Sequence, residues 1–288
     1  MNDQVTEDPQ AILDRLERQA VRYETPCGDG TMVWHVWDTS GGTAPVLVLF
    51  HGGAGSWRHW AHNIPVLAQH YRLLVPDLPG LGESASPSNI DTAEAIAEVV
   101  AAGIDAVLGR ETTYDLAGFS FGGTMASCVA AIHGARVRSL TIVGSGGVGP
   151  SNSGIELLKV RHLQGQERME AHRTNLNRLM IADPAKIDAL ALAIQDWNTM
   201  HSRVKTPILS SSGALWRALD KVHVPINGIW GDKDAPANPR AAERVAVMRA
   251  RRPDADVRMI PGAGHWVAYE APEQVNAMLL EMLRRTRP

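Results

Sequence analysis

Apolar residues follow two spacings along the chain, and the two kinds of segment alternate. Unbroken apolar runs such as residues 45–50 are typical of parallel strands that are covered on both faces. Stretches such as residues 92–108 repeat apolar positions at helical spacing. Strands are expected at residues 21–24, 32–37, 45–50, 71–77, 113–117, 137–143, 224–230 and 257–260. Helices are expected at residues 10–22, 57–70, 92–108, 124–131, 239–251 and 272–285. This alternation predicts an α/β protein with a doubly wound, mostly parallel sheet.

One long segment interrupts the alternation. Residues 144–150 are rich in Gly and Ser, and the chain then follows a helical pattern as far as residue 221. Asp183-Pro184 is typical of a helix start, because Asp is a good N-cap and Pro suits the first helical position. The pattern predicts a sheet domain from residues 1–148 and 222–288, with a helical cap inserted at 149–221.

The hexapeptide Gly-Phe-Ser-Phe-Gly-Gly, residues 118–123, lies between a predicted strand and a predicted helix. Ser120 stands at the apex of this sharp turn, where its side chain is held clear of the sheet. Gly118 and Gly122 flank it because a Cβ at either position would collide with the turn. The start of the following helix adds partial positive charge and free N–H groups. Ser120 is therefore a candidate nucleophile.

A serine hydroxyl needs a base that takes its proton, and the base needs a carboxylate that orients it. Among eleven histidines, His265 lies in a loop of small residues between the last predicted strand and the last helix. The carboxylate is expected after strand 224–230, where Asp232 and Asp234 both occur. We favour Asp234, because the spacing Gly-x-x-Asp after this strand is usual in such folds. The other aspartate is then a turn residue or a hydrogen-bond partner of the loop backbone.

The chain order Ser120, Asp234, His265 resembles that of the α/β-hydrolase superfamily, in its lidded serine hydrolase branch. His51-Gly52-Gly53 is similar to the oxyanion motif of that superfamily, and residues 76–84 are similar to its Asp-x-x-G-x-G-x-S loop. Gly264-His265-Trp266 is similar to the histidine loop of carboxylesterases and of hydrolases that split meta-cleavage products. The resemblance covers nearly the whole chain. It implies the α/β-hydrolase fold, with an eight-stranded sheet, helices on both faces and a helical cap.

The resemblance also implies which groups bind the substrate. The backbone N–H groups of Phe121 and Gly53 would form the oxyanion hole, although Gly53 could instead serve only the turn of the chain. Trp57 and Trp266 are candidates to face the substrate, with core packing as the alternative for Trp57. A cap arginine could hold a substrate carboxylate. Arg203 is one candidate for this role, and the sequence does not distinguish it from the other cap arginines: Arg161, Arg173 and Arg178.

The composition of the chain limits the classes of partner and cofactor that we expect. The net charge is −3 with no basic run, which argues against a nucleic-acid-binding surface. The chain has two cysteines, Cys27 and Cys128, so a disulfide framework is not expected. The first residues lack a signal pattern and no apolar run reaches membrane-spanning length, so a cytoplasmic protein without a membrane partner is expected. Neither metal-ligand spacings nor a Gly-rich cofactor loop occurs, so no metal and no cofactor are expected. The sequence does not decide between a monomer and a homodimer.

Three functions fit these observations. The first is hydrolysis of a small carboxylic ester through an acyl-enzyme. The second uses the same triad to break a carbon–carbon bond in a vinylogous diketone from aromatic degradation. Against the second, residues 52–56 read Gly-Gly-Ala-Gly-Ser and Phe119 stands where that group usually has Asn. The third is a receptor without enzymatic activity on the same fold. Asp at position 120 would have indicated a dehalogenase or an epoxide hydrolase.

Overall fold

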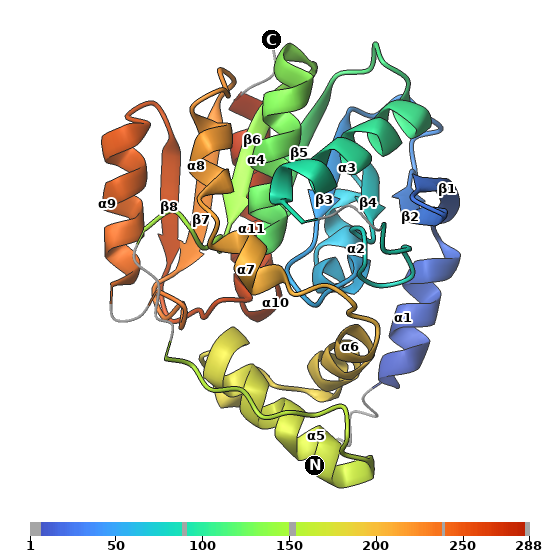
Figure 1. Cartoon of the computed structure of the whole chain (residues 1–288), viewed down its shortest axis with the longest axis vertical. Coiled ribbons are helices and arrows are strands. Elements are labelled where there is room, and N and C mark those ends of the chain that lie inside the picture. The colour runs from blue at the N-terminus through green and yellow to red at the C-terminus, as the bar shows by residue number, and fades with distance from the viewer. Residues whose placement is uncertain (1–6, 88–90, 150–153, 238–239, 286–288) are drawn as a thin grey trace.

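The computed structural model describes residues 7–87, 91–149, 154–237 and 240–285, and one eight-stranded sheet lies at its centre (Figure 1). The strand order is β1-β2-β4-β3-β5-β6-β7-β8. The strands are β1 (Val21–Cys27), β2 (Gly30–Trp37), β3 (Val46–Phe50), β4 (Arg72–Pro76), β5 (Tyr114–Phe119), β6 (Val137–Val143), β7 (Ile226–Gly231) and β8 (Asp256–Ile260). Strand β2 pairs antiparallel with β1 and β4, and the remaining pairs are parallel. The mostly parallel sheet expected from the sequence is confirmed.

The apolar runs form strands because successive side chains point to opposite faces, and both faces are covered. In β3, Val46, Val48 and Phe50 enter one buried cluster, whereas Leu47 and Leu49 enter the other. Helices α3 (Ala93–Leu108), α4 (Phe121–His133), α8 (Ala214–Leu219) and α9 (Ala241–Arg251) supply the first cluster. Helices α1 (Pro9–Arg18), α2 (Ile64–Leu67) and α11 (Pro272–Arg285) supply the second. Helices therefore lie on both faces of the sheet.

The helix expected at residues 57–70 is divided in the structure. A 3₁₀ helix, η1 (Trp57–Trp60), comes first, and α2 follows after a turn. Pro65 lies in the first turn of α2, and it lacks the N–H group that would continue a helix from the preceding residues. At the N-terminus, α1 ends at Arg18 because Val21 already pairs with Val36 in the sheet. The expected start of another helix, Pro239, lies outside the described residues, and α9 begins at Ala241.

The helices between the two parts of the sheet domain fall into two groups. Helix α5 (Gly165–Asn175), the π-helical turn η3 (Leu176–Met180), η4 (Pro184–Lys186) and α6 (Ala189–Met200) follow one another, and α5 and α6 lie apart from the sheet (Figure 1). Helices α7 (Thr206–Ser210) and α8 instead contact α4. Leu215 and Leu219 of α8 belong to the core of the sheet domain. We call residues 154–210 the insert. No helix in the described ranges is long and apolar enough to cross a bilayer.

Candidate active site

Ser120 lies on a strained turn between β5 and α4. Its φ angle is +54°, in the left-handed region that side chains with a Cβ seldom adopt. Gly118 allows the turn to be this tight, and Gly122 allows residues 50–51 to lie against it. A Cβ on Gly118 would lie 2.1 Å from the carbonyl oxygen of Gly122, and a Cβ on Gly122 would lie 2.4 Å from that of His51. The result is a partly exposed hydroxyl at the N-terminal end of a 13-residue helix.

The structure brings Ser120, His265 and Asp234 together from three separate strand ends. The Oγ of Ser120 lies 2.9 Å from Nε2 of His265, and Nδ1 of His265 lies 3.1 Å from Oδ1 of Asp234. Because a carboxylate only accepts hydrogen bonds, Nδ1 carries the ring proton and Nε2 is free to accept from the serine. Asp234 is fully buried and His265 is 6% exposed. The three groups form one line, in which His265 can take the proton of Ser120 while Asp234 holds the ring.

The second aspartate after β7 has a different partner. Oδ1 of Asp232 accepts a hydrogen bond of 2.7 Å from the backbone N–H of Gly262. This contact ties the loop after β7 to the loop that carries His265. The geometry therefore favours Asp234 as the partner of the imidazole and Asp232 as a support of the loop backbone.

The loop of residues 51–55 lies directly against the Ser120 turn. A Cβ on Gly52 would lie 3.3 Å from Cβ of Ser120, and a Cβ on Gly53 would lie 3.7 Å from Cβ of Phe121. The N–H of Gly52 donates to Nδ1 of His59. For the N–H groups of Gly53 and Phe121, no acceptor occurs within the part of the chain that the structure describes. Both groups are thus available to a substrate oxygen.

Two buried histidines fix this loop. Nδ1 of His51 donates to the carbonyl of Gly52, and Nε2 of His51 accepts from the N–H of Leu78. The ring of His59 lies against Phe119, with 5.5 Å between centroids. Burial holds the pKa of His51 below its ordinary value and that of His59 well below it, so both rings stay neutral. They act as fixed hydrogen-bond partners of the backbone.

Thr206 of α7 reaches the same loop from the insert. A Cβ on Gly53 would lie 2.2 Å from Oγ1 of Thr206 and 3.0 Å from its Cβ. Thr206 is only 5% exposed, so it closes over Gly53 and limits the space beside the candidate oxyanion donors. This contact could not be predicted from the sequence, because Lys205-Thr206-Pro207 indicates only the start of a helix.

We expect Gly53→Ala to lower kcat/KM by about 10²–10³-fold, the effect of losing one oxyanion donor. The added Cβ would displace either Thr206 or the loop that carries the N–H group. Gly146→Ala is the matched control, because a Cβ there would meet nothing within 4 Å. Adding Thr206→Gly to Gly53→Ala should restore part of the activity in an ester assay. Full activity of Gly53→Ala alone would contradict the expected displacement of this donor.

The structure places both candidate tryptophans in the core instead of at an open pocket. Trp57 and Trp266 are fully buried. The Trp57 ring lies 5.5 Å from that of Trp37, and the indole N–H of Trp266 donates to the carbonyl of His59. Since no part of either ring is accessible, packing is the role that this structure favours for both. The contact with the substrate that was expected of them stays a prediction.

The cap arginines bind backbone carbonyls of the protein itself. Arg203 donates to the carbonyls of Gly82 and Ser84, in the loop of residues 76–84. Arg161, Arg173 and Arg178 likewise donate to backbone carbonyls, at Thr199, Ile187 and Glu156 respectively. Arg203 therefore holds the insert to the 76–84 loop, and the substrate clamp expected of a cap arginine stays a prediction.

Glu270 connects the histidine loop to the insert and was not predicted from the sequence. Its carboxylate is 2% exposed and accepts hydrogen bonds from the N–H groups of Gly264, Ala182 and Asp183. A buried carboxylate is stable only with such partners. Because Gly264 precedes His265, this contact fixes the base relative to the insert.

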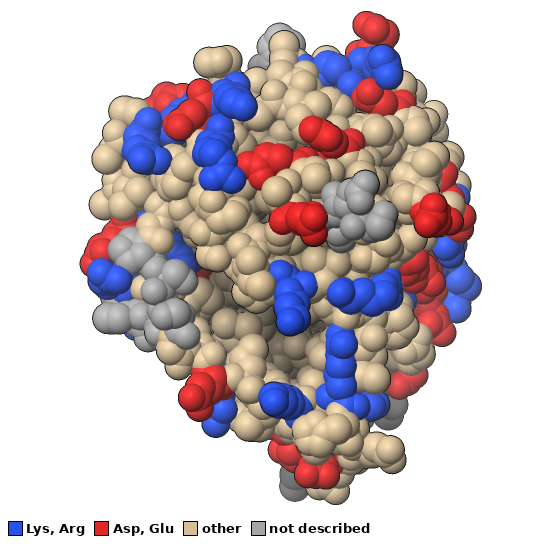
Figure 2. Space-filling view, viewed as in Figure 1, with Lys and Arg blue, Asp and Glu red and all other residues tan. Residues whose placement is uncertain are grey.

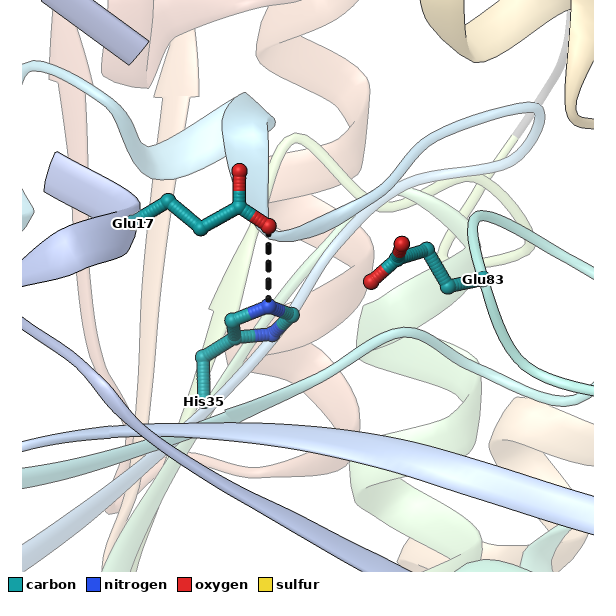
Figure 3. A group of neighbouring side chains, drawn as sticks. All are labelled: Glu17, His35 and Glu83. Atoms are coloured by element: carbon teal, nitrogen blue, oxygen red, sulfur yellow. Dashed lines mark ion pairs between the residues drawn. The ribbon is translucent and has the colours of Figure 1, made fainter. Parts of the chain in front are cut away.

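One cluster away from Ser120 has residues of the kind that bind metal ions (Figure 3). Glu17 from α1, His35 from β2 and Glu83 have ligand atoms within 4.8 Å of one another. The carboxylates already have cationic partners, since Arg58 lies 3.4 Å from Glu17 and Arg22 lies 3.6 Å from Glu83. His35 and Arg58 hold the pKa of Glu17 below its ordinary value. We interpret this cluster as an ion-pair network that joins α1 to the sheet.

The surface is hollowed within the insert and again beside it. A groove of about 610 Å³ lies within the insert, and its lining contains none of the three triad residues. It is lined by Leu157, Leu158, Lys159, His162, Leu163, Glu167, Glu170, Ala171 and Thr174. Figure 2 shows another hollow, between the insert and the sheet domain, with Lys and Arg side chains gathered beside it.

The sequence profile of the alpha/beta hydrolase family matches residues 47–278, so the chain belongs to this family and is a hydrolase. The 2-hydroxy-6-oxononadienedioate/2-hydroxy-6-oxononatrienedioate hydrolase of Burkholderia vietnamiensis is 28% identical over 289 residues, covering 93% of this chain and 97% of that protein. The resemblance inferred from the motifs is confirmed.

Two further similarities extend the comparison. The dihydrolipoyllysine-residue acetyltransferase component of the acetoin cleaving system of Pseudomonas putida is 31% identical over 283 residues, covering 90% of this chain and 68% of that protein. The structure of carboxylesterase CesB from Bacillus subtilis matches with a TM-score of 0.74 at 19% identity, covering 96% of this chain and 95% of that one. The latter likeness shows the shared fold.

Proposed function

We propose that this chain is a serine hydrolase that cleaves a small carboxylic ester through an acyl-enzyme. The observation that carries the proposal is the continuous line from Ser120 Oγ through the His265 ring to Asp234, with separations of 2.9 and 3.1 Å. Unpartnered serine hydroxyls are weak nucleophiles, and this arrangement supplies the base that activates one.

Each residue then has a defined task. Ser120 attacks the ester carbonyl while His265 takes its proton, and the protonated imidazole gives that proton to the departing alcohol. Asp234 holds the ring in the Nδ1–H tautomer and stabilises the imidazolium. The N–H groups of Gly53 and Phe121 receive the negative charge that develops on the carbonyl oxygen. In the second step, His265 activates a water molecule, which hydrolyses the acyl-enzyme and releases the acid.

A second candidate is hydrolysis of a carbon–carbon bond in a dienoate. Several relatives carry such names, including the 2-hydroxy-6-oxo-6-phenylhexa-2,4-dienoate hydrolase of Burkholderia cepacia, which is 27% identical over 263 residues. The Lys and Arg side chains beside the hollow in Figure 2 would attract a substrate that bears a carboxylate. Phe119 before the nucleophile still favours the ester reaction, because that second group usually has Asn there.

A direct comparison of two substrates tests the proposal. We expect p-nitrophenyl butyrate to be turned over with a kcat/KM at least about tenfold above that for 2-hydroxy-6-oxo-6-phenylhexa-2,4-dienoate, whose visible absorbance disappears on cleavage. Ser120→Ala controls for background in both assays. The reverse preference would establish the carbon–carbon reaction, and turnover of neither substrate would favour the receptor interpretation.

A further inference from the structure

A buried arginine contacts the carboxylate that orients His265. Arg244 of α9 is 0% exposed, and its Nη1 lies 3.2 Å from Oδ2 of Asp234. The other oxygen of Asp234 accepts from His265. The same Nη1 also donates to the carbonyl of Ser145, whose hydroxyl donates to the carbonyl of Ser120. Arg244 is thus in contact with both the carboxylate and the segment that supports the nucleophile.

Packing alone does not account for an arginine at this position. Its Nε and Nη2 atoms are buried, and no acceptor for them occurs among the described residues. Burial lowers the pKa of the Arg244 guanidinium, and the charge of Asp234 opposes that effect. An apolar side chain of similar length would avoid the desolvation of a cation, which often exceeds the gain from a buried ion pair. The cation is therefore retained at a cost in stability.

We propose that Arg244 is a positioning residue for the proposed triad: it keeps Asp234 ionised and in place, and it reduces the tendency of the His265–Asp234 pair to take up a proton. This inference rests on the proposed function. A proton added to the pair places positive charge near the guanidinium, whichever of the two residues holds it. The imidazole consequently stays available as a base at lower pH than it would beside an aspartate without a cation.

The other groups that face His265 do not replace this cation. His59, from η1, is neutral because burial holds its pKa well below the ordinary value. Glu270, from α10 (Val267–Glu270), is an anion whose oxygens accept three backbone N–H groups. Ser120 contributes a neutral hydroxyl. Within the described ranges, Arg244 is the cation in hydrogen-bond contact with Asp234.

The test is the pH dependence of kcat/KM for an ester in Arg244→Met, Arg244→Gln and Arg244→Lys. The rate rises with pH as the imidazole loses its proton, and we expect the midpoint of that rise to move upward by about one pH unit in the Met and Gln variants. The Lys variant, which keeps the charge, should stay near the wild type. Arg249→Met is the matched control, because Arg249 lies on the same helix and contacts the carbonyl of Val257.

The outcomes separate the inference from the function on which it rests. The Gln variant keeps an amide donor toward Asp234, so the same pH profile can be measured on it if the Met variant does not fold. A purely structural arginine would lower the melting temperature and the plateau rate without moving the midpoint, and that result would overturn the inference. If a fluorophosphonate fails to label Ser120 in the wild-type protein, the proposed function itself fails. Labelled wild type with an unmoved midpoint in the neutral variants rejects only the role of Arg244.

Discussion

Ser120→Ala is expected to leave the fold intact and to lower the turnover of a p-nitrophenyl ester by about 10⁵–10⁶-fold. Alanine keeps the Cβ that this backbone conformation already accommodates, and Ala54 has a similar positive φ of 45°. Only the hydroxyl that attacks the carbonyl is lost. Residual turnover should come from the oxyanion donors and substrate binding alone.

The matched control for this variant is Ser127→Ala. Ser127 lies in α4, is fully buried and donates its hydroxyl to the carbonyl of Gly123. Its replacement also removes one hydroxyl oxygen, but from the helix that follows Ser120 and away from the reaction. We expect kcat/KM to stay within about threefold of the wild type, since only one internal hydrogen bond is lost. Comparable activity of Ser120→Ala and wild type would refute the nucleophile assignment.

Asp234→Asn is expected to have the second-largest effect, a fall of about 10⁴-fold in kcat. A neutral amide neither selects the Nδ1–H tautomer of His265 nor stabilises the imidazolium. The same change removes the anionic partner of Arg244, and an uncompensated buried charge typically costs about 3–5 kcal/mol of stability. Turnover and the free energy of unfolding, from urea denaturation, should therefore both decrease.

Asp232→Asn provides the comparison for that prediction. The asparagine oxygen can still accept the hydrogen bond from the N–H of Gly262, which Asp232 accepts at 2.7 Å. We expect a change of no more than about threefold in kcat, because the Asp232 carboxylate contacts a loop backbone rather than the imidazole. If the two variants exchanged their effects, Asp232 would be the orienting carboxylate.

The sheet could be predicted from the sequence because local signals determine it. Central strands such as β3 are short apolar runs, and the buried faces of β3 follow directly from alternation of its side chains. The turn around Ser120 could be predicted in part for the same reason, since a Cβ on Gly118 would meet Gly122 and Gly123, whereas Gly122 reflects the distant residues Phe50 and His51. Chain order then indicated His265 and Asp234 without knowledge of their separation.

Contacts between distant segments could not be predicted. Trp57 and Trp266 stand beside reactive residues in sequence, yet other rings bury them completely. Thr206 lies beside Gly53 although more than 150 residues separate them in the sequence, and no local pattern indicates this contact. Arg244 did leave a signal: it shares the buried face of α9 with Ala241, Val245 and Met248, at helical spacing. A charged residue on an apolar helix face indicates a buried partner, which here is Asp234.

The most direct test of Ser120 as the activated nucleophile is mass spectrometry of the protein after treatment with a fluorophosphonate, which reacts with activated serine hydroxyls. We expect one adduct, on the peptide that contains Ser120, and a loss of labelling in His265→Gln, where the base is missing. An adduct on a different residue, or labelling of Ser120 that persists at full rate in His265→Gln, would contradict it.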